Sequence, residues 1–442
     1  MRRAVLVVAV LVVLSGCASL PLGGHPPGDP GDVRLGWENG YWYDDPVGVT
    51  PEDGYNESEL DAVVSRQMAR IERIRELEFN ETVPVEVVSR EQYLANRSGG
   101  GGSDTHEAWN DQVWEGLFVV GESTGTGESF NDTLGVSVQG YYAPGRSEIV
   151  IVSDSPTPTV DRRTLAHELV HALQDQQFGL GPNPDTQDRQ LAVNGVIEGE
   201  ANYLRAVYER RCGDEWDCIP LPESGDGGGG GGGGAFNDGL LLTIYQPYAT
   251  GPTFVDRVRE RGGWDAVDDL HERFPDSTEQ VIHPELYPDE EPVNVTVRDR
   301  SSEEWSRFDH DPVADTVGEA SVYAMFVSNG VVVTDDRHGY RSDPSAGWAG
   351  DALVPYTNGS DGPEGAYVWK TVWDSEADAE EFLDAYRELL VGEGARQPRA
   401  NVYVVPESSG FGDAFRVRRA GDTVVVVNAP TVADLDDVHA PP

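Results

Sequence analysis

Residues 167–171 read His-Glu-Leu-Val-His, and this pentapeptide restricts the fold of its segment more than any other feature of the chain. Histidines at positions 167 and 171 share one face only if the backbone is helical, because they then lie one turn apart. Their neutral imidazole nitrogens suit a single metal ion. Glu168 would flank that ion and act on a metal-bound water. We therefore predict a helix that carries a hydrolytic metal site.

The residues around the pentapeptide predict that this helix packs into a core and does not lie on the surface. Asp161 suits the N-cap position, and Gly179 suits the end of the helix. An apolar stripe with helical periodicity is formed by Leu165, Leu169, Ala172 and Leu173. Two solvated histidines on a surface helix are the alternative, and this stripe argues against it.

A metal held by two histidines needs at least one further protein ligand if a position is to stay open for water. The next helical pattern covers residues 188–211, and Glu198 lies beside its apolar face. An antiparallel pair of such helices would bring Glu198 to the metal. Glu200 is the competing ligand, since it lies on the same helix about 200° around the axis from Glu198.

The H-E-x-x-H motif at 167–171, followed by E-G-x-A at 198–201, resembles the gluzincin branch of the zincin metallopeptidases. The match is specific over roughly residues 140–290. More closely, the chain is similar to a group of haloarchaeal surface lipoproteins that carry such a core. The resemblance implies a zinc (Zn2+) peptidase that hydrolyses peptide or protein substrates. It also implies that Glu168 is the general base and that zinc is bound by His167, His171 and Glu198.

Amide hydrolysis passes through an oxyanion, which is normally stabilised by a donor besides the metal. Tyr248 is the first candidate, by its place in the gluzincin resemblance, and His283 in the segment STEQVIHPELY is the second. For both residues, the alternative is an ordinary packed and hydrogen-bonded side chain. Three further histidines, which we expect to be structural or solvated, are His271, His310 and His338.

The segment before the metal helix, GYYAPGRSEIVIV at residues 140–152, is predicted to form a strand entered through a Pro-Gly turn. In zincins, an edge strand in this position pairs with extended substrate through main-chain groups. An ordinary strand inside a sheet fits the same pattern.

The N-terminal residues 1–17 predict a lipoprotein signal peptide. Two arginines precede an apolar run at residues 4–14, which is too short to span a bilayer. The sequence Leu-Ser-Gly-Cys that follows resembles a lipobox, in which Cys17 becomes the lipidated first residue. Residues 18–34 are rich in proline and glycine and suit a tether. We expect an exported protein, anchored by lipid on the extracellular face of the cell membrane.

Two cysteines remain besides the lipobox residue. Cys212 and Cys218, in the segment CGDEWDC, form a close pair in a chain expected to lie outside the reducing cytosol. Two cysteines without further His or Cys nearby favour a local disulfide over a metal site.

The charge of the chain is strongly one-sided, with 78 Asp and Glu against 32 Lys and Arg and a formal net charge of -46. Because 38% of the residues are hydrophobic, the chain has enough apolar side chains to form a core. We therefore expect the Asp and Glu side chains to lie on the surface of a folded protein. Such a surface suits molar salt, where its self-repulsion is screened. Nucleic-acid binding is disfavoured, because no basic stripe is present to contact phosphates.

We expect an α+β protein with a zincin-like domain at residues 35–291 and a smaller C-terminal α+β domain at 292–442. A glycine-rich insertion at 223–234 is predicted to be flexible, with a mobile lid as the alternative. The expected helices cover 57–79, 315–327 and 375–390, and the expected strands cover 83–89, 352–356, 366–372, 401–405, 414–418 and 423–428. The alternative to a peptidase is a catalytically silent zincin-fold lipoprotein with a structural or binding role.

Overall fold

The computed structural model describes residues 34–50, 53–97, 103–134, 138–155, 157–221, 236–359 and 365–441. The expected lipidation site Cys17, the signal peptide and the glycine-rich insertion at 223–234 lie outside the described residues. The described chain is a mixed α+β structure, which is the predicted class. Among the described residues, no helix combines the length and the apolar character needed to cross a membrane.

The first part of the chain builds a three-stranded sheet with the strand order β3-β5-β4. Its strands are β3 (Val85–Val88), β4 (Gly140–Ala143) and β5 (Glu148–Val152). Two short strands precede it, β1 (Trp37–Glu38) and β2 (Tyr41–Trp42), and the helices of this part are α1 (Glu57–Arg75), α2 (Arg90–Arg97), α3 (Asp104–Gly116) and α4 (Thr126–Leu134). Helix α1 ends earlier than predicted, because Glu76 adopts a left-handed conformation with φ 62°.

Residues 140–152 form a hairpin of two strands, whereas the sequence pattern predicted one strand. Pro144 and Gly145 lie in the turn between β4 and β5, where Arg146 N–H donates to the Ala143 carbonyl at 3.0 Å. Strand β5 pairs in parallel with β3, and β4 forms the edge of the sheet. The Pro-Gly pair therefore reverses the chain in the middle of the segment, and it does not introduce a single strand.

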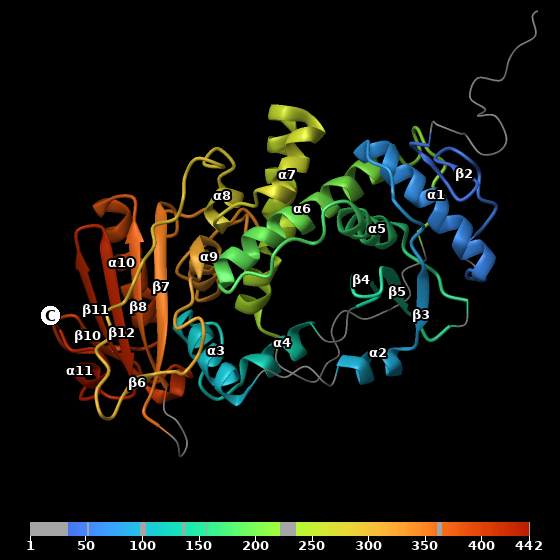
Figure 1. Ribbon diagram of the computed structural model, residues 1–442. Coiled ribbons are helices and arrows are strands. Elements are labelled where there is room, and N and C mark those ends of the chain that lie inside the picture. The colour runs from blue at the N-terminus through green and yellow to red at the C-terminus, as the bar shows by residue number, and fades with distance from the viewer. Residues whose placement is uncertain are drawn as a thin grey trace, which may run out of the picture.

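Long helices occupy the middle of the molecule (Figure 1). They are α5 (Arg162–Gln177), α6 (Gln187–Arg211) and α7 (Asp238–Glu272), followed by the short α8 (Thr278–Ile282). Asp161 caps α5 by accepting a hydrogen bond from Arg163 N–H, as its position predicted. The apolar stripe of α5 is buried in one core with α1 and β5. This packing fixes the face of α5 that carries the two histidines.

The last part of the chain forms a seven-stranded sheet with the order β6-β7-β8-β12-β11-β10-β9 (Figure 1). Its strands are β6 (Ser306–Arg307), β7 (Trp348–Thr357), β8 (Gly365–Trp373), β9 (Arg396–Arg399), β10 (Val402–Val404), β11 (Ala414–Ala420) and β12 (Thr423–Ala429). The accompanying helices are α9 (Gly318–Ser328), α10 (Glu376–Gly392), the 3-10 turn η1 (Glu407–Ser409) and α11 (Leu435–Val438). Helices α9 and α10 pack on one side of this sheet, and α11 packs on the other.

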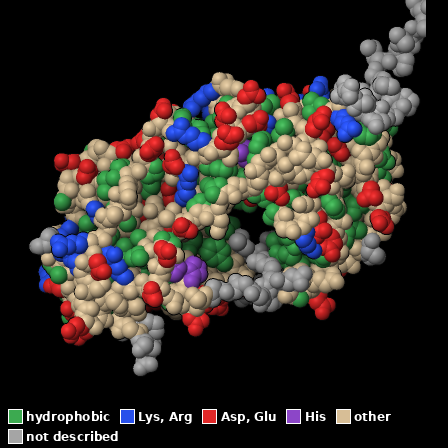
Figure 2. Space-filling model, in the orientation of Figure 1, with side chains coloured by type: hydrophobic (Ala, Val, Ile, Leu, Met, Phe, Trp, Pro, Cys, Tyr) green, Lys and Arg blue, Asp and Glu red, His purple; other side chains and the backbone are tan. Residues whose placement is uncertain are grey.

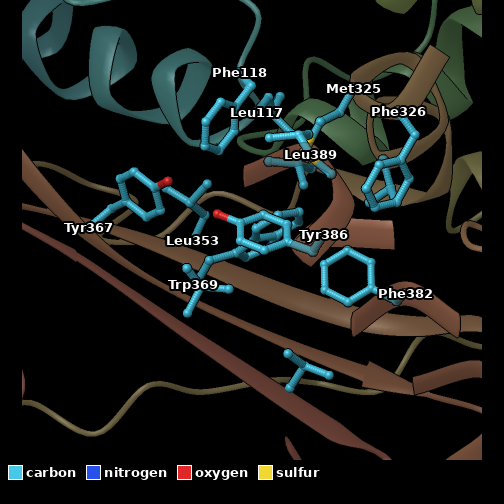
Figure 3. Close-up of a cluster of buried hydrophobic side chains, with 14 of the residues drawn as sticks. Leu117, Phe118, Met325, Phe326, Leu353, Tyr367, Trp369, Phe382, Tyr386 and Leu389 are labelled. Carbon is cyan, nitrogen blue, oxygen red and sulfur yellow. The ribbon is translucent and has the colours of Figure 1, made fainter. Parts of the chain in front are cut away.

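Helix α3 belongs to the early part of the sequence but packs against this late sheet. Figure 3 shows Leu117 and Phe118, at the end of α3, in the same cluster as Leu353 and Tyr367 of the sheet. The approach is close, since a Cβ atom added to Gly116 would lie 2.7 Å from the Leu353 side chain. The core beside the seven-stranded sheet is therefore built from residues on both sides of position 292.

Candidate metal centre

The structure brings His167, His171 and Glu198 together between α5 and α6. The two Nε2 atoms of the histidines lie 3.0 Å apart. Oε2 of Glu198 lies 3.1 Å from Nε2 of His167 and 3.3 Å from Nε2 of His171. In a tetrahedral zinc site with bonds of about 2.05 Å, ligand atoms are about 3.3 Å apart. The three atoms therefore have the spacing of ligands that share one ion.

The chemical types of the three ligands also fit zinc. Oε2 of Glu198 is buried and accepts no hydrogen bond within the described residues. A buried carboxylate oxygen without a donor is costly unless a cation lies beside it. Two imidazoles and one carboxylate form a set that zinc takes in hydrolytic enzymes.

Glu200, the competing ligand, points away from the histidines and is fully engaged elsewhere. Its Oε1 lies 2.5 Å from Nε of Arg75, and its Oε2 lies 2.9 Å from Nε2 of His271. Gln174 donates to the same Oε2 at 2.8 Å. Of the two candidate ligands on α6, Glu198 is the one that faces the histidine pair.

Glu168 is held beside the cluster by the main chain of the edge strand. Tyr142 N–H on β4 donates to Oε2 of Glu168 at 2.8 Å. Burial raises the pKa of Glu168, and this effect outweighs the charges of His171 and His167, which lower it. A raised pKa suits a carboxylate that must accept a proton and release it again.

The ligands are strongly coupled to one another. Burial disfavours the charged form of His171, but Glu198 outweighs burial and raises the pKa of His171 to about 9. Burial also disfavours the charged form of Glu198, and here the histidines prevail and lower its pKa. A metal ion competes with the proton for the imidazole lone pair, so metal binding at this site releases protons.

Tyr248, the first candidate for the oxyanion donor, lies beside the cluster. Its ring stacks on His167 with ring centroids 6.3 Å apart. Burial raises the pKa of Tyr248, and the carboxylates of Glu198 and Glu168 raise it further. The hydroxyl therefore keeps its proton at neutral pH and is available as a donor.

His283, the second candidate, lies at the end of α8 against a different group of residues. Its Nε2 is 3.1 Å from Oε1 of Glu319, and its Nδ1 is 4.0 Å from Glu285. Within the described residues, none of its hydrogen bonds or ion pairs reaches the histidine pair. The structure thus brings Tyr248 to the cluster and leaves His283 in another one.

Two supporting residues were not predicted from the sequence. Oε1 of Gln174 lies 3.0 Å from Nδ1 of His171, and this contact fixes the imidazole whose Nε2 faces the cluster. Asp175 accepts a hydrogen bond from the Tyr142 hydroxyl at 2.7 Å and so anchors the strand that holds Glu168. Gln174 lies three residues after His171 on one helix face, which is the only sequence signal for its role.

The two paired cysteines lie at the far end of α6. Cys212 and Cys218 form a disulfide across the turn that follows the helix. Arg70 of α1 donates to the Asp217 carbonyl in the same turn at 2.9 Å. The disulfide closes a local loop and contributes no group to the metal centre.

One family profile, described as "Domain of unknown function (DUF8575)", matches residues 306–439 of the chain. No curated protein and no solved structure matches the chain. The matched segment covers the seven-stranded sheet and its helices, whereas the metal centre lies on α5 and α6. The chemistry of the centre is therefore inferred from its own residues.

Proposed function

We propose that this protein is a zinc-dependent metallopeptidase with a zincin-like core of the gluzincin type. The observation that carries the proposal is the convergence of two imidazoles and one carboxylate at mutual distances of 3.0 to 3.3 Å. A second carboxylate, that of Glu168, is oriented beside them by a main-chain donor. This is the minimal set for water activation and peptide hydrolysis.

In this proposal His167, His171 and Glu198 hold the zinc ion. When bound, zinc supplies a Lewis acid that lowers the pKa of a coordinated water to about 7 and polarises a carbonyl. Glu168 takes the proton from the attacking water and passes it to the leaving amine, because its raised pKa lies closer to neutral pH, where a group can act first as base and then as acid.

Tyr248 and the edge strand complete the assignment. The Tyr248 hydroxyl, which stays protonated, donates to the oxyanion that develops on the scissile carbonyl. Strand β4 lies at the edge of its sheet, and one of its N–H groups already contacts Glu168. An extended peptide that pairs with β4 would therefore run past the catalytic carboxylate.

We further propose that the peptidase acts outside the cell. The lipobox-like sequence ending at Cys17 supports a lipid anchor in the membrane, and the acidic composition supports a halophilic medium. Its substrates are then exported or environmental peptides and proteins, and nucleic acids are not among its partners.

The test uses the full chain in buffered molar KCl, with zinc content and peptide cleavage measured on the same sample. We expect about one zinc per chain and cleavage of a mixed peptide library. Glu168→Gln should keep the zinc and lose about 10²-fold or more in kcat, since it removes the general base. Tyr248→Phe should keep the zinc and lower kcat by about 10²-fold, since it removes one oxyanion donor.

Three other outcomes would contradict parts of this proposal. Stoichiometric zinc without cleavage of the library would favour the catalytically silent surface protein over the peptidase. If the chain binds no zinc at an equimolar concentration of the metal, the assignment of the three zinc ligands is refuted. Cleavage that persists in Glu168→Gln would refute the role of Glu168.

A further inference from the structure

A second cluster of carboxylates lies away from the metal centre, where α8 meets the end of β8. It comprises Glu279 of α8, Glu290 in the following loop, and Asp374 directly after β8. One carboxylate oxygen from each of the three lies within 4.8 Å of the others. Glu279 is buried, Glu290 is half-buried and Asp374 is exposed, so the cluster opens to solvent on one side.

Glu319 adds a fourth carboxylate from the inner side. It lies in the first turn of α9 and is 0% exposed. His283 contacts its Oε1, but its Oε2 is buried and has no hydrogen-bond partner within the described residues. The first turns of α8 and α9 touch, because Ala320 N–H donates to Thr278 Oγ1 at 3.2 Å. Glu319 is therefore next to Glu279 and carries an oxygen that still needs a positive partner.

Positive charge near the cluster is scarce. Beyond burial, Glu319 has the largest influence on Glu279, and with Glu290, Asp374 and Asp188 it helps to raise the pKa of Glu279 to about 9. Burial also raises the pKa of Glu319 well above its usual range, opposed only by Arg341 among its nearest charges. Burying carboxylates together in this way is unfavourable unless protons or a cation neutralise them.

We propose that Glu279, Glu290 and Asp374 bind a calcium ion, whose charge also offsets the buried carboxylate of Glu319 beside Glu279. All three ligands offer oxygen donors, which suit a hard cation and not zinc or copper. They come from a helix, a loop and a strand end, and calcium accepts such irregular sets of six to eight oxygens more readily than magnesium does. Water would supply the remaining ligands on the side of Asp374.

His283 is the neighbour of Glu319 on the side away from its free oxygen. Its Nε2 lies 3.1 Å from Oε1 of Glu319, whereas Oε2 has no hydrogen-bond partner within the described residues. The ion would join α8 and the loop after it to the end of β8. Calcium would thereby link the helices in the middle of the molecule to the seven-stranded sheet.

A third acidic group provides an internal comparison. Glu115, Glu122 and Asp413 also lie within 4.8 Å of one another. There, however, Asn428 donates to Asp413 at 2.8 Å and Gln112 donates to Glu115 at 2.8 Å. These carboxylates already have amide donors, so we make no metal assignment for them and use Glu122 as a control position.

The experiment is equilibrium dialysis of the full chain against calcium in buffered molar KCl, with bound calcium measured by mass spectrometry. We expect one strongly bound calcium per chain and a higher Tm with calcium than with equal magnesium. Glu290→Gln and Asp374→Asn should each weaken calcium binding at least tenfold and abolish the shift in Tm. Both residues reach solvent, so these variants should fold.

Two matched controls remove the same charge elsewhere. Glu291→Gln changes the exposed neighbour of Glu290, and Glu122→Gln changes the other acidic group; both should bind calcium as the parent does. The proposal is overturned if the parent binds no calcium, which would mean that protons neutralise the cluster. It is also overturned if Glu290→Gln and Asp374→Asn bind calcium normally, or if magnesium binds equally well. None of these outcomes depends on zinc or on peptidase activity.

Discussion

Glu198 and Glu200 are two residues apart on α6, yet their carboxylates have different partners. Glu198 faces two histidines, and Glu200 forms an ion pair with Arg75 in which both side chains are 2% exposed. Helical geometry separates the two carboxylates by about 200° around the axis. One acid is therefore available to a metal, and the other is part of the packing between α1 and α6.

This difference predicts opposite effects of the same substitution. Glu200→Gln should leave the buried Arg75 guanidinium with only the partly exposed Asp268 as a counter-charge and lower the free energy of unfolding by about 3 kcal/mol. Glu198→Gln should have a smaller effect on stability and weaken zinc binding by about 10²-fold or more. Denaturant unfolding and zinc titration in molar KCl measure both quantities. A stable Glu200→Gln that has lost its zinc would reverse the assignment.

The Tyr142 N–H group predicts a main-chain contribution to catalysis. Tyr142→Pro removes the donor to Glu168, and proline is tolerated on an edge strand where the N–H does not pair with the sheet. Tyr142→Ala removes the same side chain but keeps the N–H, so it is the matched control. We expect kcat of the proline variant to be about tenfold below that of the alanine variant, with equal zinc content. Equal kcat in the two variants would show that Glu168 needs no such donor.

At the scale of elements, the sequence predicted the parts of the site that depend on local signals. The helix bearing His167 and His171 follows from a cap, a glycine stop and an apolar stripe, and all three lie within one segment. The preference for Glu198 likewise agrees with the face of α6 that meets α5. These features were predictable because each is encoded within a few turns of helix.

The contacts missed by the sequence join segments that are distant in the chain. Tyr142 reaches Glu168 only because residues 140–152 reverse as a hairpin, and alternation alone cannot distinguish a hairpin from one strand. The contact of His283 with Glu319 could not be predicted for the same reason, since Glu319 lies on α9. Such pairs depend on tertiary packing and leave no periodic signal.

The crossing of α6 and α7 depends on glycine and fixes the position of Glu198. A Cβ atom added at Gly199 would lie 2.6 Å from the backbone of Gly251, and one added at Gly251 would lie 2.4 Å from the Gly195 carbonyl. A side-chain movement cannot relieve these contacts, because they are made with backbone atoms of the neighbouring helix. Any substitution at this crossing must move the helices apart, and Glu198 adjoins it.

Gly199→Ala should therefore affect both stability and metal binding. Overpacking of this kind typically costs about 1–3 kcal/mol, and the displaced helix should weaken zinc binding by about tenfold. The control is Gly127→Ala in α4, where an added Cβ meets nothing within 4 Å. That variant should retain its zinc affinity and be no less stable than the parent. Thermal unfolding and zinc titration would contradict the argument if the two variants behaved alike.

At the scale of the whole molecule, the predicted class was right, while the packing between early and late segments was not visible in the sequence. The end of α3 brings Leu117 and Phe118 into the core beside the seven-stranded sheet, which is otherwise formed mainly by later residues (Figure 3). Nothing in the periodicity of α3 indicates which sheet it contacts. A truncation after residue 291 should therefore expose this apolar face of α3.

The acidic surface predicts that the folded protein needs salt. Figure 2 shows Asp and Glu side chains distributed over the visible face, in keeping with a formal net charge of -46. The Debye length falls from about 10 Å at 0.1 M to about 3 Å at 1 M, so repulsion between neighbouring surface carboxylates is largely screened in molar salt. Because folding brings these charges closer together than they are in the unfolded chain, screening stabilises the folded state.

We expect Tm to rise steeply as KCl is raised from about 0.1 M and to level off above about 1 M, where little repulsion remains to be screened. Circular dichroism of the full chain at a series of KCl concentrations measures this. The double variant Glu381→Gln, Glu388→Gln removes two exposed charges from α10 and should reach its plateau at lower salt. Sucrose, which strengthens burial without screening charge, should not replace KCl. If sucrose restores the same Tm at low salt, or if the double variant keeps the parent's salt dependence, charge repulsion is not the cause.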